Sequence, residues 1–168
     1  QLQEWLDEYG ESHQNKINKL IHWICVPIIM LSLIGILSKV SISSHAIAIS
    51  LGSGELISQY ATLFLPLDLG NIIIVIAFIY YLRMSVPMAA GMFVIGIVIR
   101  LICAIISSTF ITNDIYIYIS IFFIAWIGQF IGHKIEGKKP SFIKDIQFLL
   151  IGPAWLLSYI YQKFGVRY

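Results

Sequence analysis

Long apolar runs constrain this chain more than any other feature of its sequence. A helix needs about 17–25 predominantly apolar residues to cross a bilayer core, and several runs approach or reach that length. They are Leu20–Leu37, Val86–Ile106 and Ile115–Ile131, with the shorter Ile72–Leu82 and the weaker candidate Ile146–Tyr161, which Gln147 and Pro153 interrupt. With 58% hydrophobic and only 12% charged residues, a soluble globular domain is disfavoured. We therefore predict an all-α integral membrane bundle of about four to six helices, in a single domain over residues 1–168.

The basic residues predict which ends of these runs face the cytoplasm. Lys16 and Lys19 precede the first run, and the most basic connection follows Ile115–Ile131. The lysines of that connection are Lys134, Lys138, Lys139 and Lys144. Because cytoplasmic loops of membrane proteins carry an excess of Lys and Arg, we expect both segments, and the N-terminus, on the cytoplasmic side. The net charge of +2 gives no support for nucleic acid as a partner.

Three of the four histidines lie at borders of apolar runs, on the side that the lysines assign to the cytoplasm. They are His13, His22 and His133, whereas His45 falls in the opposite loop. The three have polar residues four positions earlier, namely Tyr9, Asn18 and Gln129, and Glu136 follows His133 by three positions. Imidazole is the commonest metal ligand, and a polar group one turn away can orient it. The pattern predicts a site for Fe(II) or Zn(II), with histidines that contact lipid phosphate as the alternative.

The spacing of the first two histidines predicts a break in the chain between them. Nine residues separate His13 from His22, so a straight helix would turn them about half a revolution apart. One helix could not direct both at a single ion. We therefore expect a break near Gln14–Ile17 and a short amphipathic helix over Leu2–His13. This helix would lie along the membrane interface with Trp5 as its anchor.

The sequence leaves the roles of five further residues open. Arg100 lies near the middle of its run, where an unpaired charge is costly. It could bind a substrate carboxylate, or it could form an internal ion pair or snorkel toward an edge of the membrane. Gln129 and Asn18 could orient the histidines or join helices through hydrogen bonds. Tyr9 could donate a proton or serve as an interfacial aromatic residue. Glu136 could add a carboxylate to the metal ligands.

Two segments of the sequence resemble a known family. The first is Tyr9-x-x-x-His13-x-x-x-x-Asn18-Lys19-x-x-His22-x-x-x-x-Pro27, and the second is Trp126-x-x-Gln129-Phe130-Ile131-Gly132-His133-x-x-Glu136-Gly137-x-x-Pro140. Together they resemble the fungal 2-hydroxy-fatty-acid dioxygenases, a family of small membrane proteins. Both motifs occur in the right order and at the right ends of the apolar runs, and Pro153 fits a proline usual in the family's last segment.

The resemblance implies an Fe(II)-dependent enzyme of fatty-acid α-oxidation. Its partners would be a 2-hydroxy fatty acid, molecular oxygen and membrane lipid, and its product a fatty acid one carbon shorter. His13, His22 and His133 match the family's histidines and are expected to bind the iron, while Tyr9, Asn18, Gln129 and Glu136 match other motif positions and are expected to serve catalysis. Arg100 is the candidate for binding the substrate carboxylate.

Other function classes remain open from the residues themselves. A non-catalytic membrane protein that binds lipid or acts as a scaffold would use the histidines as headgroup contacts, and a zinc-dependent lipid hydrolase would use them without oxygen. A transporter or channel is disfavoured because the polar residues gather on one side of the membrane. No nucleophile elbow or phosphate-binding glycine loop occurs in the sequence.

Overall fold

Helices account for nearly all of the chain that the structure describes. The structure is a computed structural model and describes residues 2–41, 68–110, 113–137 and 142–168, with the side chains of 142–149 left aside. Its helices are α1 (Leu2–Glu11), α2 (Lys16–Leu37), α5 (Leu69–Leu82), α6 (Val86–Thr109), α7 (Asp114–Glu136) and α8 (Phe142–Lys163). This confirms the predicted all-α bundle. His45 lies outside the described residues.

Three of these helices, α2, α6 and α7, are long and apolar enough to cross a membrane, and α5 is a shorter apolar helix. Local signals explain where two of them begin. Asp68 caps α5 by accepting a hydrogen bond from the Asn71 amide at 2.8 Å. Ser85 caps α6 in the same way, and Pro87 in the first turn suits a helix start. The predicted apolar runs therefore became helices close to their expected bounds.

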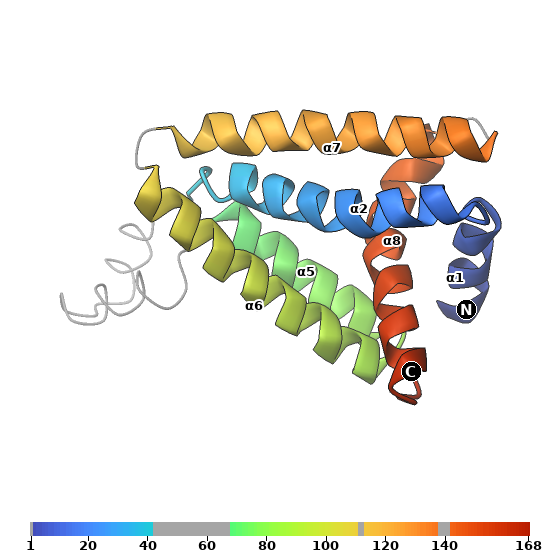
Figure 1. The fold of residues 1–168 in the computed structure, drawn as a ribbon. Helices are drawn as coiled ribbons and strands as arrows, with labels where there is room; N and C mark the ends of the chain where they lie inside the picture. Colours follow the sequence, from blue (N-terminus) through green and yellow to red (C-terminus); the bar gives the residue numbers. More distant parts are fainter. Residues whose placement is uncertain (1, 42–67, 111–112, 138–141) are drawn as a thin grey trace.

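Helices α2 and α7 lie side by side along their length (Figure 1). Gly128 and Gly132 of α7 allow the close approach, since they stand four residues apart and form one small stripe. A Cβ added at Gly128 would lie 2.6 Å from Cys25 Sγ, and one at Gly132 would meet Asn18 Oδ1. This contact brings the start of α2 against the end of α7, where the predicted site residues are concentrated.

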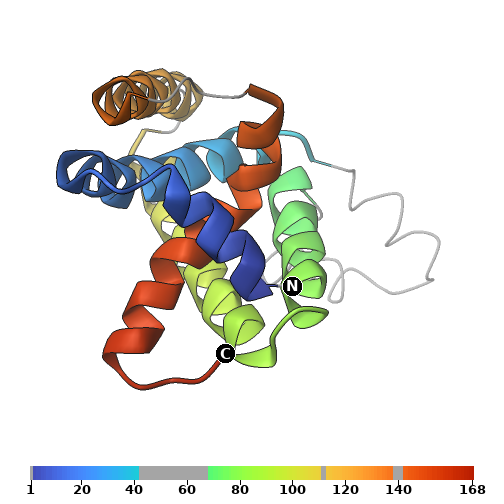
Figure 2. The same cartoon turned by 90° about the vertical axis from the view of Figure 1, so that its right-hand side faces the viewer.

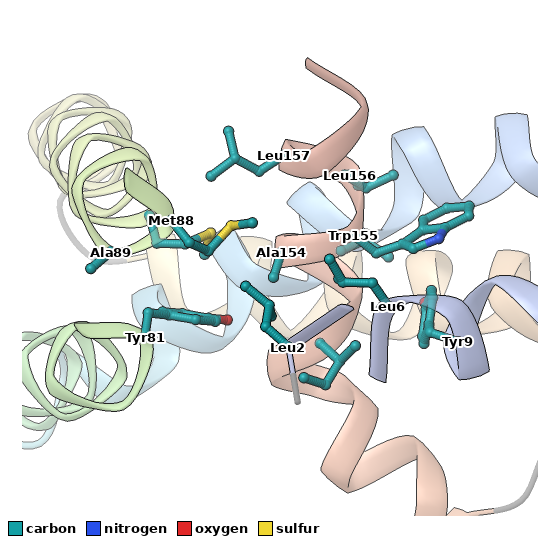
Figure 3. Close-up of a cluster of buried hydrophobic side chains, with 13 residues drawn as sticks. Leu2, Leu6, Tyr9, Tyr81, Met88, Ala89, Ala154, Trp155, Leu156 and Leu157 are labelled. Carbon is teal, nitrogen blue, oxygen red and sulfur yellow. The ribbon is translucent and has the colours of Figure 1, made fainter. Parts of the chain in front are cut away.

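The two remaining helices, α1 and α8, pack on each other at the same end of the bundle. Leu2, Leu6 and Tyr9 of α1 are buried, and they lie against α8 residues such as Trp155 (Figure 3). Trp5 also packs against this core and stacks on Tyr80 with ring centroids 6.4 Å apart. The amphipathic helix is thus present with its apolar face covered by protein. The partly buried Trp5 packs against this core, and its role as an interfacial anchor stays a prediction.

Helix α8 does not run parallel to α2 and α7. It passes across α2 near the beginning of that helix, and both views show this direction (Figures 1 and 2). Pro153 lies inside α8, as the sequence indicated for the weak candidate Ile146–Tyr161. Helix α8 therefore runs in a different direction from α2 and α7, two of the helices that are long and apolar enough to cross a membrane.

Candidate metal centre

The predicted break in the chain separates α1 from α2. Helix α1 ends at Glu11 and α2 begins at Lys16, so the break covers residues 12–15, about two residues earlier than the expected Gln14–Ile17. His13 therefore lies in the turn, and not on the amphipathic helix where we expected it. Asn15 caps α2, because its side-chain oxygen accepts a hydrogen bond from the Ile17 amide at 2.8 Å. This turn carries His13 back toward the first turns of α2, as the argument from helix geometry required.

His13, His22 and His133 meet in space from three different segments: the turn, α2 and α7. One ligand atom from each ring lies within 4.8 Å of the others. The Nε2 atoms of His13 and His22 are 2.9 Å apart, and the His133 ring centroid lies 5.5 Å from that of His13 and 5.1 Å from that of His22. His13 and His22 are each only 1% exposed. The predicted cluster of these three histidines is thus present in the fold.

Backbone carbonyls fix the tautomers of the two buried rings. His13 Nδ1 lies 2.6 Å from the Tyr9 carbonyl oxygen, and His22 Nδ1 lies 2.9 Å from that of Asn18. A carbonyl oxygen only accepts hydrogen bonds, so each Nδ1 must carry the proton and donate it. Both Nε2 atoms then present lone pairs. This is the orientation by an outer hydrogen bond that metal-binding histidines commonly have.

Two facing lone pairs at 2.9 Å repel each other unless a proton or a metal ion lies with them. A proton would make one ring an imidazolium, which burial disfavours. Burial lowers the pKa of His13 from 6.5 to about 4, so this imidazole is neutral at physiological pH. Two nitrogens that bind one ion at about 2.1 Å and at a right angle would be about 3.0 Å apart. The spacing of the two atoms therefore fits a shared metal ion.

Glu136 lies beside the cluster and acts on the turn. Its carboxylate accepts hydrogen bonds from the amides of Gln14 and Asn15, at 2.8 and 3.0 Å, and from Asn18 Nδ2 at 2.9 Å. These bonds tie the end of α7 to the start of α2. The carboxylate does not belong to the group of possible metal ligands found among the described residues. The role of Glu136 as an additional ligand stays a prediction, and what the structure shows is that its carboxylate holds the turn that carries His13.

Gln129 and Asn18 approach the histidines from α7 and α2. Both side chains are buried, with exposures of 7% and 0%. The Gln129 side chain interacts with the His22 ring, yet its Nε2 atom has no hydrogen-bond partner among the described residues, and neither has Asn18 Oδ1. A buried polar atom without a partner costs free energy. Asn18 Oδ1 faces Gly132 in the contact between α2 and α7, whereas Gln129 Nε2 is a buried donor next to His22 that a polar group bound at the histidines would satisfy.

Aromatic rings form the apolar wall of the site. Tyr9 stacks on His13 with ring centroids 4.2 Å apart, and Trp155 lies 5.3 Å from both rings. The Tyr9 hydroxyl points at α8, where a Cβ at Gly152 would lie 3.0 Å from it. Sequence reasoning missed Trp155, because no polar spacing marks it and only its place in the last apolar segment could have drawn attention to it.

Arg100 is not part of this cluster. Its guanidinium forms an ion pair with Asp68 at 2.9 Å, and Asp68 is buried beside the far end of α2, where the Leu69 amide donates to the Val40 carbonyl. Of the interpretations, the internal ion pair is the one observed. The histidines gather at the other end of α2, so the structure does not bring Arg100 together with them, and its role in substrate binding stays a prediction without support from the site.

Comparison with known proteins agrees with this arrangement. No curated protein and no solved structure has significant similarity to the chain. The sequence does match the family described as "2-hydroxy-palmitic acid dioxygenase Mpo1-like" over residues 1–164. That match contains all three histidines and every helix of the described fold. The chain therefore belongs to the Mpo1-like 2-hydroxy-palmitic acid dioxygenase family.

Proposed function

We propose that this protein is an Fe(II)-dependent dioxygenase that converts 2-hydroxy fatty acids into fatty acids one carbon shorter. The observation that carries the proposal is the facing pair of Nε2 atoms in His13 and His22, 2.9 Å apart with both Nδ1 atoms held by carbonyl oxygens. His133 supplies the third nitrogen. The family name provides the substrate class.

The set of ligands suits this chemistry. Three neutral imidazoles bind either Fe(II) or Zn(II), but Zn(II) has no redox chemistry, and a dioxygenase must reduce oxygen. When bound, Fe(II) would supply the electrons that activate oxygen. One 2-hydroxy acid and one oxygen molecule balance against the shorter fatty acid, carbon dioxide and water, so no further reductant is required.

The protein's own side chains have separable tasks in this proposal. Tyr9 and Asn18 contribute their carbonyl oxygens, which hold His13 and His22 in the tautomer that binds metal. Glu136 keeps the turn of residues 12–15 in place through its hydrogen bonds. Gln129 Nε2 is a buried donor that has no partner in the described part of the chain, and we assign it the task of donating a hydrogen bond to the polar head of the substrate.

The surroundings of the site favour an amphipathic substrate. Trp155 and the Tyr9 ring exclude water from one side of the histidines, which strengthens the electrostatic interactions there. The lysines at the start of α2 and the end of α7 support a cytoplasmic position for this end of the bundle, because cytoplasmic segments carry an excess of basic residues. A carboxylate head could then reach the histidines from the interface while its acyl chain stays in hydrocarbon.

Oxygen uptake tests the proposal directly. Protein purified without oxygen and loaded with Fe(II) is mixed with 2-hydroxyhexadecanoic acid, and the products are identified by mass spectrometry. We expect one oxygen consumed for each pentadecanoic acid formed. Hexadecanoic acid, which lacks the hydroxyl, and protein loaded with Zn(II) serve as controls. Hydrolysis of a 2-hydroxyhexadecanoyl ester by the Zn(II)-loaded protein without oxygen would favour a hydrolase instead, and binding of the free acid without turnover would favour a lipid-binding protein.

A further inference from the structure

Helix α8 passes across α2 (Figure 1), and side chains of α2 and of the C-terminal part of α8 line an apolar groove on the surface. It has a volume of about 630 Å³ and is lined by Trp23 of α2 with Tyr159, Ile160, Lys163 and Phe164 of the α8 region. We call this the α2–α8 groove. Its volume lies within the range of about 300–1,000 Å³ common for small-molecule sites. None of these residues has a role in the site described above.

The groove is continuous with the aromatic wall of the histidine site. Trp23 directly follows His22 in the sequence, and its ring lies 6.4 Å from that of Tyr159. Tyr159 in turn meets Trp155 edge-on at 4.8 Å, and Trp155 lies 5.3 Å from His13. One buried ring, that of Trp155, therefore separates the groove from the histidines.

The groove has one charged residue. Lys163 lies in the last turn of α8, and no ion-pair partner for it occurs among the described residues. The rest of the lining is aromatic or aliphatic, apart from the Tyr159 hydroxyl. A lysine of this kind lays its methylene stem along apolar surface and keeps its ammonium group near water. Such a combination complements a ligand with one apolar chain and one anionic head.

We propose that the α2–α8 groove is a loading site for a single-chain fatty acid. The acyl chain would pack on Trp23, Tyr159 and Ile160, and the carboxylate would pair with the Lys163 ammonium. This inference rests on the proposed function, because the 2-hydroxy fatty acid is the substrate that would move from the groove past Trp155 to the histidines. Lys163 and Trp23 thereby become substrate-recognition residues outside the metal site.

The position of the groove suits delivery from the membrane. The outer face of α2 beside Trp23 is apolar and exposed, with Leu20 at 61% and Ile24 at 55%, as expected of a surface in contact with lipid. A fatty acid could therefore enter laterally without leaving the bilayer. Helix α8 rises about 12 Å from Trp155 to Lys163. The carboxylate would therefore move a distance of this order from Lys163 to the histidines beside Trp155.

Fluorescence quenching tests this site without relying on turnover. The iron-loaded protein is reconstituted in phosphatidylcholine vesicles that contain increasing amounts of chain-brominated hexadecanoic acid, at alkaline pH where the acid is ionised. Bromine quenches tryptophan on contact, and Trp23→Phe shows how much of the signal comes from the groove. We expect saturable quenching that Trp23→Phe largely removes. Brominated hexadecanol, which lacks the carboxylate, should quench more weakly.

Charge variants give the matched comparison. We expect Lys163→Met to weaken fatty-acid quenching about five-fold, the effect of losing one exposed charge pair. Lys163→Arg keeps the positive charge and should retain the fatty-acid quenching of the wild type. Lys134→Met removes another exposed lysine, at the end of α7, and should leave quenching unchanged. Equal affinity in Lys163→Met, or equal quenching by the alcohol and the acid, would overturn the proposal.

The two proposals fail in different ways. Saturable quenching that depends on Lys163, in a protein that consumes no oxygen with any 2-hydroxy acid, would keep the groove and remove the dioxygenase. Oxygen uptake by a protein whose fatty-acid affinity is indifferent to Lys163→Met would keep the enzyme and remove the loading site.

Discussion

The Nε2 atoms of His13 and His22 lie 2.9 Å apart, although nine residues separate these histidines in the sequence. A break in the backbone, and not a continuous helix, makes this possible. A distant part of the chain holds this break in place, because the Glu136 carboxylate accepts hydrogen bonds from the amides of Gln14 and Asn15. The geometry of the candidate metal site therefore depends on how closely α2 and α7 pack.

The first prediction concerns Glu136. Glu136→Ala should weaken Fe(II) binding by about 10- to 100-fold, the usual effect of removing a residue that orients metal ligands, while the helices remain folded. Glu136→Gln retains one acceptor oxygen, so its Fe(II) affinity should fall less than that of Glu136→Ala. Iron titration measures the Fe(II) affinity, and circular dichroism on the same samples measures the helix content. A complete loss of iron in Glu136→Gln, with helicity intact, would instead make the carboxylate a ligand.

The close contact of α2 with α7 yields a stability prediction. In Gly128→Ala the new methyl group would lie 2.6 Å from Cys25 Sγ, and overpacking of this kind costs about 1–3 kcal/mol. Thermal unfolding in detergent should show the decrease. Cys25→Ala removes the sulfur, so the double variant should recover most of the lost stability. If Gly128→Ala alone is as stable as the wild type, the packing of α2 against α7 at this position is looser than described.

Gln129 should matter for turnover more than for stability. Gln129→Leu removes a buried donor that has no partner among the described residues, and such a replacement is close to neutral for folding. We expect iron content and melting temperature near those of the wild type, with kcat/KM lowered by about ten-fold or more. A variant with unchanged kcat/KM would show that Gln129 only joins helices.

Arg100 should behave as a structural residue. Its partner Asp68 is buried, so Arg100→Met leaves a carboxylate without compensation and should destabilise the protein by about 3 kcal/mol. The double variant Arg100→Met/Asp68→Leu should be more stable than Arg100→Met. The KM for 2-hydroxyhexadecanoic acid should remain at the wild-type value in both. A large increase in KM would support Arg100 as a substrate-binding residue.

The sequence predicted the helices and the histidine cluster because each rests on a local rule. Apolar run length marked the helices, and the spacing of His13 and His22 required the break that the structure has between α1 and α2. The role of Glu136 was missed, since its hydrogen bonds go to backbone amides more than a hundred residues earlier. Trp155 was missed for a related reason, because only the passage of α8 across α2 brings it to His13.

Metal content tests the central claim most directly. Protein purified without oxygen and reconstituted with Fe(II) is analysed for iron as wild type, as His133→Ala and as His45→Ala, the fourth histidine of the chain. We expect about one iron per chain in the wild type and in His45→Ala, as a folded site should give, and a loss of most of it in His133→Ala at unchanged helicity. Iron that stays in His133→Ala, or none in the wild type after reconstitution, would contradict the account.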